Sequence, residues 1–320
     1  FGHVGIDYVG NLFDNNKQII RFPPLSFFRK LKISKNKGIK IDDNISINNL
    51  TDIIINNFLK KSPLKSYNFF HNNTQKKQFK LFFEKFMNNS NTINFKKKIF
   101  LGIHYGLSKI YKIKILNKKF IFTQEDRPNY CHHYNKYFKT KFIFVIRDPR
   151  ATFAGSFNSQ NLKNLKKTYG FDRILGNWLI ADKFVEKIKK EKLYILKNEK
   201  FQGSSKLKKE MKKLSRWLQI RYSEQLTKTS YFGKKWHGDS SYLGKFERSK
   251  PLPKNFYTLK NVKKRWKSKL NDEQILDIEM LLFYSMKKHG YQLENNLTIV
   301  NFIKAYYRIL FFYKDKNNFF

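Results

Sequence analysis

The feature that most constrains the fold is a run of five apolar residues, Phe142–Ile146 (FIFVI), which leads directly into Arg147, Asp148 and Pro149. A short apolar run of this kind predicts a strand buried on both faces, as in a parallel sheet covered by helices. Pro149 cannot donate to a sheet ladder, so the strand is predicted to end before it. Ligands of open α/β sheets bind beyond the carboxyl ends of the strands. Arg147 is therefore predicted to meet an anion there, with an ordinary ion pair to Asp148 as the alternative.

Strands alternate with helices along the chain. Two further strands are predicted at residues 119–123 and 192–196, besides the strand at 141–146. Apolar residues at helical spacing predict helices and loops over 26–98 and helices at 161–190, 203–228, 272–289 and 297–313. The inner face of the helix at 161–190 is predicted to carry Trp178, Leu179 and Phe184. This alternation argues for an α/β fold with a central parallel β-sheet flanked by helices. The 320 residues suffice for one large domain or two small ones.

The first residues, FGHVGID, predict the end of a strand already under way at Phe1, then a turn at Gly5 and a helix. A helix N-terminus offers unpaired N–H groups and the positive end of a dipole, which suit phosphate or sulfate. The turn lacks the Lys and Ser/Thr of the Walker pattern, which disfavours ATP or GTP hydrolysis. We therefore expect a second anion-binding segment here, and we expect the N-terminal strand to be truncated.

The chain is strongly basic: 66 Lys and Arg against 24 Asp and Glu give a formal net charge of +42. Such a charge would suit a nucleic acid, whose phosphates it neutralises. The lysines are nevertheless scattered over the whole chain, and Asn, Ile, Phe and Tyr are abundant with them, which is typical of an AT-rich genome. We favour this second interpretation and expect no specific nucleic-acid partner. The positive field would still attract an anionic substrate.

The single cysteine, Cys131, excludes an intrachain disulfide, and nothing indicates an oxidising compartment, so we predict a cytoplasmic protein. The neighbouring His132 and His133 lack the spacing of a zinc site, and we predict no metal. We find no apolar stretch long enough for a transmembrane helix. Residues 297–313 are apolar but interrupted by two cations. They predict a packed C-terminal helix, with peripheral contact to a membrane surface as the alternative.

Several segments, taken together, resemble a known family. Residues 141–157 (KFIFVIRDPRATFAGSF) are similar to the 3′-phosphate-binding segment of sulfotransferases that use 3′-phosphoadenosine 5′-phosphosulfate (PAPS). Residues 3–19 (HVGIDYVGNLFDNNKQI) are similar to the family's opening segment, with Gly5 on the family glycine. Further similar segments follow in the family's order: YILKNEKF at 194–201, WHGDS at 236–240, KRW at 264–266 and HGY at 289–291. The resemblance covers nearly the whole chain to about residue 293.

This resemblance implies a P-loop-like sulfotransferase architecture over residues 1–295, followed by a basic and aromatic helical tail at 296–320. It implies that PAPS is the sulfuryl donor. The residues that would bind it are His3, Val4, Gly5, Ile6 and Asp7 in the first segment, Arg147 and Ser156 in the second, and Lys264 and Arg265 in the third.

The chain departs from the family pattern at the opening turn. His3 occupies the place of a basic residue, and Ile6 and Asp7 occupy the places of two hydroxyl residues. A carboxylate at Asp7 is expected to repel a phosphosulfate unless it turns away as a helix cap or serves as a base. Ser156 lies one position after the usual serine, which is a rotation of about 100° on a helix. These departures leave cofactor binding expected and catalysis less certain from the sequence.

If the chain is active, the resemblance implies in-line attack of an acceptor hydroxyl or amine on the sulfur of PAPS, without a metal. His3 could supply positive charge near the leaving phosphate when protonated. The candidate bases are His104 in FLGIHYGL, and Glu125 and Asp126 in TQEDRPNY, a segment similar to where related enzymes place acceptor-side residues. The expected acceptor is a small molecule or glycan, with a carbohydrate or glycolipid favoured by analogy with bacterial relatives.

Two other functions stay open at this point. The chain could be a catalytically impaired relative that binds adenosine 3′,5′-bisphosphate or a sulfated glycan, which Ile6 and Asp7 would explain. It could also be a basic nucleic-acid-binding protein, for which the net charge is the one argument.

Overall fold

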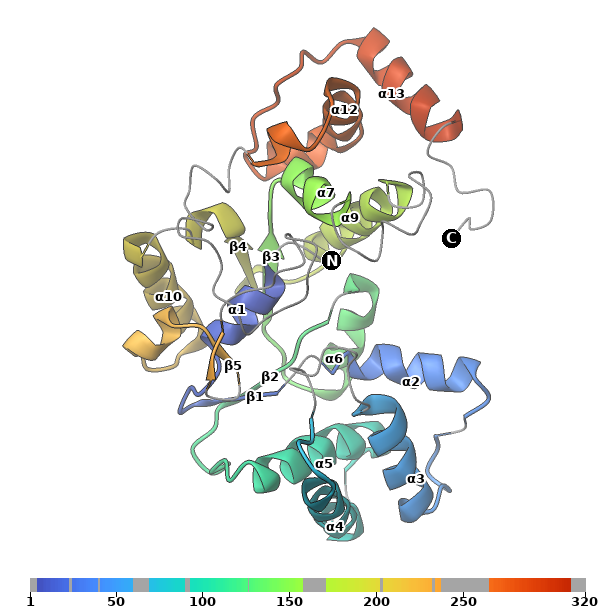
Figure 1. The fold of residues 1–320 in the computed structure, drawn as a ribbon, viewed down its shortest axis with the longest axis vertical. Coiled ribbons are helices and arrows are strands. Elements are labelled where there is room, and N and C mark those ends of the chain that lie inside the picture. The colour runs from blue at the N-terminus through green and yellow to red at the C-terminus, as the bar shows by residue number, and fades with distance from the viewer. Residues whose placement is uncertain are drawn as a thin grey trace.

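A computed structural model describes residues 5–22, 25–39, 41–59, 69–89, 93–125, 127–157, 171–201, 204–231, 234–236 and 265–311 (Figure 1). Within these ranges the backbone alone is described for residues 33, 156, 157, 171–174, 204, 205, 234, 235, 265 and 309. The α-helices are α1 (Ile6–Leu12), α2 (Phe27–Asn36), α3 (Ile47–Ile53), α4 (Asn73–Asn89), α5 (Phe95–Ile110), α6 (Cys131–Tyr137), α7 (Pro149–Phe157), α9 (Phe171–Glu186), α10 (Ser204–Leu218), α12 (Asp272–Lys288) and α13 (Ile299–Phe311).

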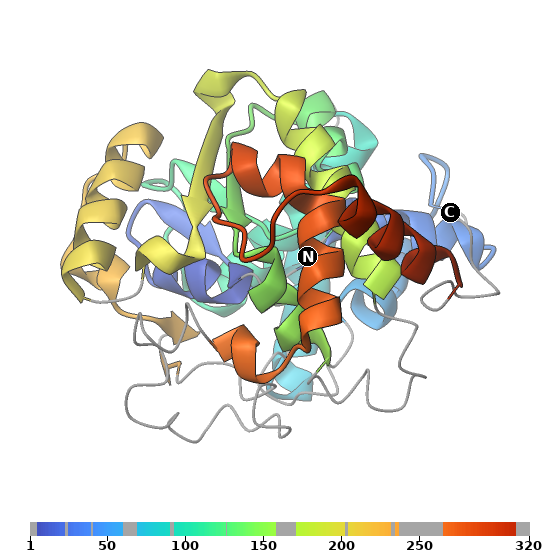
Figure 2. The same cartoon turned by 90° about the horizontal axis from the view of Figure 1, so that it is seen from above.

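The longer strands form two parallel pairs. β1 (Ile19–Arg21) pairs with β2 (Phe120–Phe122), and β3 (Phe142–Ile146) pairs with β4 (Leu193–Lys197). A short antiparallel pair, β5 (Ser230–Tyr231) and β6 (Lys234–Lys235), lies beside α1. In Figures 1 and 2, α10 lies on one side of the β3–β4 pair and α9 on the other. The expected α/β fold, with parallel strands flanked by helices, is confirmed.

The two parallel pairs are not joined by a strand among the described residues. Between them lies a cavity of about 360 Å³, which is lined by strand residues of both pairs. Apolar side chains from β2 and β3 contribute much of this lining: Ile121, Phe122, Phe142, Ile143 and Val145. The strand expected to end at Phe1 and Gly2 lies outside the described residues and stays a prediction.

Three clusters of buried side chains hold the layers together. The first joins the β1–β2 side to helices α2–α6 and includes Phe58 and Phe83. The second joins α1, β3, β4 and α10 and includes Leu12 and Leu196. The third joins α7, α9 and α12 and includes Trp178. The second cluster positions the site, because it packs α1, which follows the first predicted anion-binding segment, against β3, which precedes the second.

The predicted strands coincide with β2, β3 and β4 to within one or two residues. The predicted helices at 203–228, 272–289 and 297–313 contain α10, α12 and α13. Leu179 was expected on the inner face of its helix, and this is wrong, because it is 40% exposed while its neighbour Trp178 is buried. Successive residues of a helix point about 100° apart, so the two cannot both face the core fully. None of the described helices combines the length and apolarity needed to cross a membrane.

Candidate functional site at the strand ends

Hydrogen bonds join the carboxyl ends of β3 and β4. The backbone N–H of Asp148 donates to Oε1 of Glu199, at 2.7 Å. Glu199 also accepts a hydrogen bond from the hydroxyl of Tyr291, at 3.3 Å. Burial raises the pKa of Glu199. The hydrogen bond from the Asp148 N–H and the charge of Arg147 oppose this rise in part. Arg147 directly follows β3 and precedes Asp148, so its backbone lies where the two strand ends meet.

The N-terminus of α1 reaches the same point. Gly5 precedes the helix with φ 92° and ψ 18°, a left-handed conformation that favours glycine. A Cβ atom on Gly5 would lie 2.8 Å from Nδ2 of Asn198, the residue that follows β4. Gly5 thus contacts Asn198, and Asn198 is next to Glu199, which bonds the residue after Arg147. The two predicted anion-binding segments therefore lie together at neighbouring strand ends.

The carboxylate of Asp7 faces the β1–β2 pair. Oδ1 of Asp7 accepts a hydrogen bond from Nε2 of Gln124, at 3.0 Å, and Gln124 follows β2 closely. Burial lowers the pKa of Arg21, and the nearby side chains of Asp14, Tyr231 and Asp7 raise it. Asp7 thus accepts a hydrogen bond from Gln124 and lies near the positive charge of the buried Arg21. The sequence left open whether Asp7 would face and repel a phosphosulfate. In the structure its carboxylate instead bonds Gln124, beside the β1–β2 pair.

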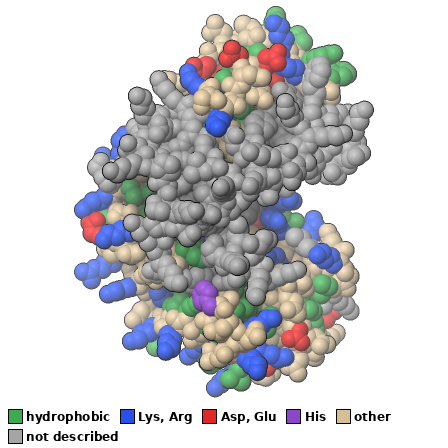
Figure 3. Space-filling model, in the orientation of Figure 1, with side chains coloured by type: hydrophobic (Ala, Val, Ile, Leu, Met, Phe, Trp, Pro, Cys, Tyr) green, Lys and Arg blue, Asp and Glu red, His purple; other side chains and the backbone are tan. Residues whose placement is uncertain are grey.

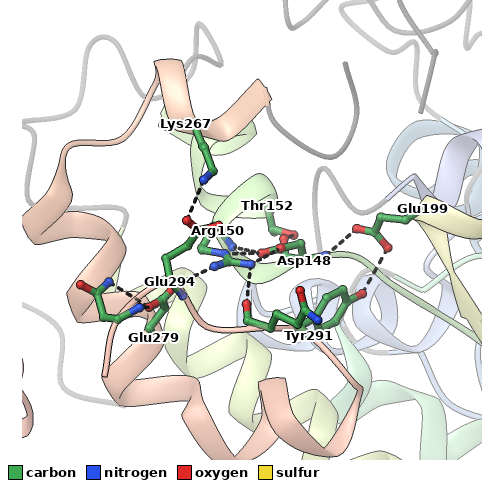
Figure 4. Close-up of polar contacts among 10 residues, drawn as sticks. Asp148, Arg150, Thr152, Glu199, Lys267, Glu279, Tyr291 and Glu294 are labelled. Carbon is green, nitrogen blue, oxygen red and sulfur yellow. Dashed lines mark hydrogen bonds and ion pairs between the residues drawn. The ribbon is translucent and has the colours of Figure 1, made fainter. Parts of the chain in front are cut away.

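A buried ionic cluster fixes the segment after β3 (Figure 4). Arg150 donates twice to the carboxylate of Asp148, at 3.0 and 2.7 Å, and once to Oε1 of Glu279, at 2.5 Å. Its guanidinium also donates to the carbonyl of Gln292 and lies 4.3 Å from the ring centre of Trp266. Burial alone would lower the pKa of Arg150, but Asp148 and Glu279 raise it. Asp148 therefore forms a buried ion pair with Arg150.

We compared the chain with known proteins. No protein-family model matches it, and no curated protein matches it. Among solved structures, the fold is similar to one titled "Sulfotransferase Domain from the Curacin Biosynthetic Pathway", with a TM-score of 0.52 and 13% sequence identity. The match covers 91% of this chain and 95% of that domain. The chain has a sulfotransferase fold.

In this sulfotransferase fold the acceptor-side candidate Glu125 lies next to Gln124, which bonds Asp7. Glu125 is half-buried. Burial lowers the pKa of the nearby Lys30 to about 8, and the charge of Glu125 opposes this decrease. It also raises the pKa of Tyr134, as burial does. Glu125 therefore lies among Lys30, Tyr134 and the segment that holds Asp7.

His104 lies elsewhere, inside the helical core. It is 3% exposed, its Nδ1 is 2.8 Å from the carbonyl of Phe100, and its ring packs against Phe22. Burial lowers the pKa of His104 to about 4, so the imidazole is neutral near pH 7. The other candidates lie outside the described residues: His3, Val4, Asp126 and Lys264 entirely, and Ser156 and Arg265 in their side chains.

The sequence analysis did not identify Glu199 or Glu279 as parts of the site. Glu199 follows a predicted strand, as Arg147 does, and this shared position was a usable signal. Glu279 carries no such signal, because it lies 129 residues from Arg150 in the sequence. Its full burial, which Asp277 on the same helix shares, is seen only in the structure.

Proposed function

We propose that the chain transfers a sulfuryl group from PAPS to a hydroxyl or amine of an acceptor, with a carbohydrate or glycolipid as the acceptor class. The observation that carries this proposal is the convergence of Gly5 and Arg147 at the ends of β3 and β4. One nucleotide with phosphates at both ends needs both segments at once. The sulfotransferase fold supports the same assignment.

The groups at the strand ends suit PAPS chemically. The first-turn N–H groups of α1 have no intrahelical partner by helix geometry, and they are donors for an anion. Arg147 adds a guanidinium, whose planar fork matches a phosphate. The three nearby carboxylates are engaged elsewhere: Asp7 with Gln124, Asp148 with Arg150, and Glu199 with Asp148 N–H and Tyr291. In this proposal Arg147 and the first-turn N–H groups face the ligand.

Each segment has a distinct task in this proposal. Arg147, with Ser156, binds the 3′-phosphate, and the turn of His3, Val4, Gly5, Ile6 and Asp7 binds the 5′ side through backbone amides. Lys264 and Arg265 add positive charge over the nucleotide. When bound, PAPS supplies the sulfuryl group and departs as adenosine 3′,5′-bisphosphate. Fixed donors at both ends orient the sulfur for in-line attack and need no reorganisation during the reaction.

We assign the base to Glu125. It lies next to Gln124, which bonds Asp7, and its carboxylate could take the proton of an acceptor hydroxyl. Asp126 is the neighbouring alternative, and His3 is proposed to oppose charge on the leaving phosphate. The buried His104 receives no chemical role here.

Calorimetric titration with adenosine 3′,5′-bisphosphate tests the nucleotide site. Arg147→Ala is expected to weaken binding by about 2 kcal/mol, or about 30-fold, because it removes a charge-assisted contact to the 3′-phosphate. The matched control is Arg216→Ala on the exposed side of α10, which removes the same charge far from the strand ends and should leave affinity unchanged. An unchanged affinity in Arg147→Ala would refute the assignment.

Transfer is tested separately with radiolabelled PAPS and a panel of glycans and glycolipids. Wild-type protein is expected to label at least one acceptor, and Glu125→Gln should lose transfer while it keeps nucleotide binding. Tight nucleotide binding without any transfer would instead support the catalytically impaired relative. Salt-sensitive binding to random DNA that added nucleotide does not affect would support the nucleic-acid alternative. Against that alternative, Lys and Arg are spread over the described parts of the face seen in Figure 3 and form no single patch there.

A further inference from the structure

Helix α13 presents its apolar side chains to solvent. Ile299 is 78% exposed, Ile303 is 63% exposed and Phe311 is 66% exposed. Four more large apolar or aromatic residues of the same helix are exposed: Val300, Tyr306, Tyr307 and Leu310. Apolar side chains gather over α13 at the upper right of Figure 3. A helix of a globular protein normally turns its apolar stripe toward the core, so this orientation needs an explanation.

The opposite face of α13 is fixed to the domain by specific contacts. Nε of Arg308 lies 2.8 and 2.9 Å from the two carboxylate oxygens of Asp277, which is fully buried on α12. Ala305 is fully buried, and the ring of Phe302 packs edge-on against Phe283, with centroids 5.2 Å apart. Rotating the helix to bury its apolar side would leave Asp277 buried without Arg308, which is costly. The exposed stripe is therefore held outward.

The exposed residues form one continuous stripe. At about 100° per residue, the seven side chains fall within an arc of about 140°. Lys304 lies at the edge of this arc and is itself exposed. An apolar stripe rich in aromatic residues and bordered by a cation is typical of a helix that lies in the interface of a membrane.

The size of the stripe argues against a second copy of the chain as its partner. Thirteen residues give a helix about 20 Å long. With a stripe about 10 Å wide, the contact would cover about 200 Å², against about 800 Å² per partner in a stable complex. A lipid surface needs no such minimum, because insertion of a few apolar groups adds to attraction between cations and anionic headgroups. The net charge of +42 supplies that attraction.

We propose that α13 docks the protein on anionic membranes, with the stripe of Ile299, Val300, Ile303, Tyr306, Tyr307, Leu310 and Phe311 in the headgroup region. The inserted part is the stripe, and the Arg308–Asp277 ion pair keeps it facing the lipid. This docking is independent of the proposed sulfuryl transfer and does not require the nucleotide site to be active.

Vesicle flotation tests the docking with the full chain. Wild-type protein is mixed with phosphatidylcholine vesicles that contain or lack phosphatidylserine, and the bound fraction is measured at low and high salt. The test variant is Ile303→Glu, with Ile303→Ser as a second variant of unchanged charge. The matched control is Leu81→Glu on α4, because Leu81 is also 63% exposed and the charge change is identical. Circular dichroism checks that all variants keep their helices.

We expect the wild type and Leu81→Glu to bind phosphatidylserine vesicles alike, and both Ile303 variants to bind at least about 10-fold more weakly. The proposal is overturned if the wild type and the three variants bind the vesicles equally. It is also overturned if high salt reduces the bound fraction of all four proteins to the same extent, because charge alone would then explain binding. A dimer in sedimentation that Ile303→Glu converts to a monomer would also overturn it, since the stripe would be an interface between copies.

Discussion

Replacing Arg150 by methionine tests how the segment after β3 is held in place. The side chain of Arg150 is almost fully buried and donates to Asp148, Glu279 and the carbonyl of Gln292. Methionine keeps the unbranched shape and can still contact Trp266, but it removes the positive charge. The substitution therefore leaves two carboxylates without their shared cation, and one of them, Glu279, is fully buried.

The expected loss follows from which contacts remain. Glu279 would keep hydrogen bonds from the backbone N–H groups of Glu294 and Asn295 and from the Asn295 amide. Asp148 would keep the N–H of residue 150. Removing one partner of a buried ion pair costs about 3–5 kcal/mol in free energy of unfolding. At about 2.1 cal/mol/K per residue, 320 residues convert this into a fall in Tm of about 4–7 °C.

Urea unfolding followed by tryptophan fluorescence measures this loss, since Trp266 lies against Arg150. Lys267→Met is the control: its ion pair with Glu294, at 2.6 Å, is about half exposed, and Lys267 also lies over the ring of Trp266. Exposed pairs contribute about 0–1 kcal/mol, so the control should stay within about 0.5 kcal/mol of wild type. If Arg150→Met costs no more than Lys267→Met, the buried cluster does not stabilise the strand end as we argue.

Two further substitutions test the turn and the core. Gly5→Ala should lower the free energy of unfolding by about 1–2 kcal/mol, because alanine resists φ 92° and its Cβ would meet Asn198; a melting curve that matches wild type would contradict the turn geometry. His104→Leu tests a pH effect: between pH 6.5 and about 4 the unfolded state binds a proton that the folded state, with a His104 pKa of about 4, does not. Stability of the wild type should therefore fall by up to about 3 kcal/mol more than that of the variant as the pH drops through this window, as measured by urea unfolding at several pH values. Parallel pH curves would show that the pKa of His104 is not lowered in the folded state.

The strands that carry the site could be predicted because their residues act locally. FIFVI is apolar along its whole length, and Pro149 follows it closely, so the predicted strand at 141–146 differs from β3 by one residue. β1 was not predicted as a strand. It has three residues, and Asn, Lys and Gln precede it, so the segment is too short to show the alternation that identifies a strand. Leu179 was misplaced for a related reason: the helical pattern identifies a face but not its exact centre.

The partners of the charged residues could not be predicted, since they depend on contacts between distant segments. Asp7 and Gln124 are 117 residues apart, and Asp148 and Glu199 are 51 apart. Sequence alone therefore left Asp7 as a carboxylate that would repel a phosphosulfate. The structure gives it a donor on the neighbouring strand pair, which no local pattern encodes.

The acids around the proposed anion site are held by donors from the chain itself. Each carboxylate near Arg147 has its own donor: Arg150 for Asp148, the Asp148 N–H and Tyr291 for Glu199, and Gln124 for Asp7. Asp148 is the nearest acid to Arg147 along the chain. Arg150 holds Asp148 from the buried side. The second arginine of the RDPR sequence thus holds Asp148 in place, and Glu279 anchors that arginine in the core.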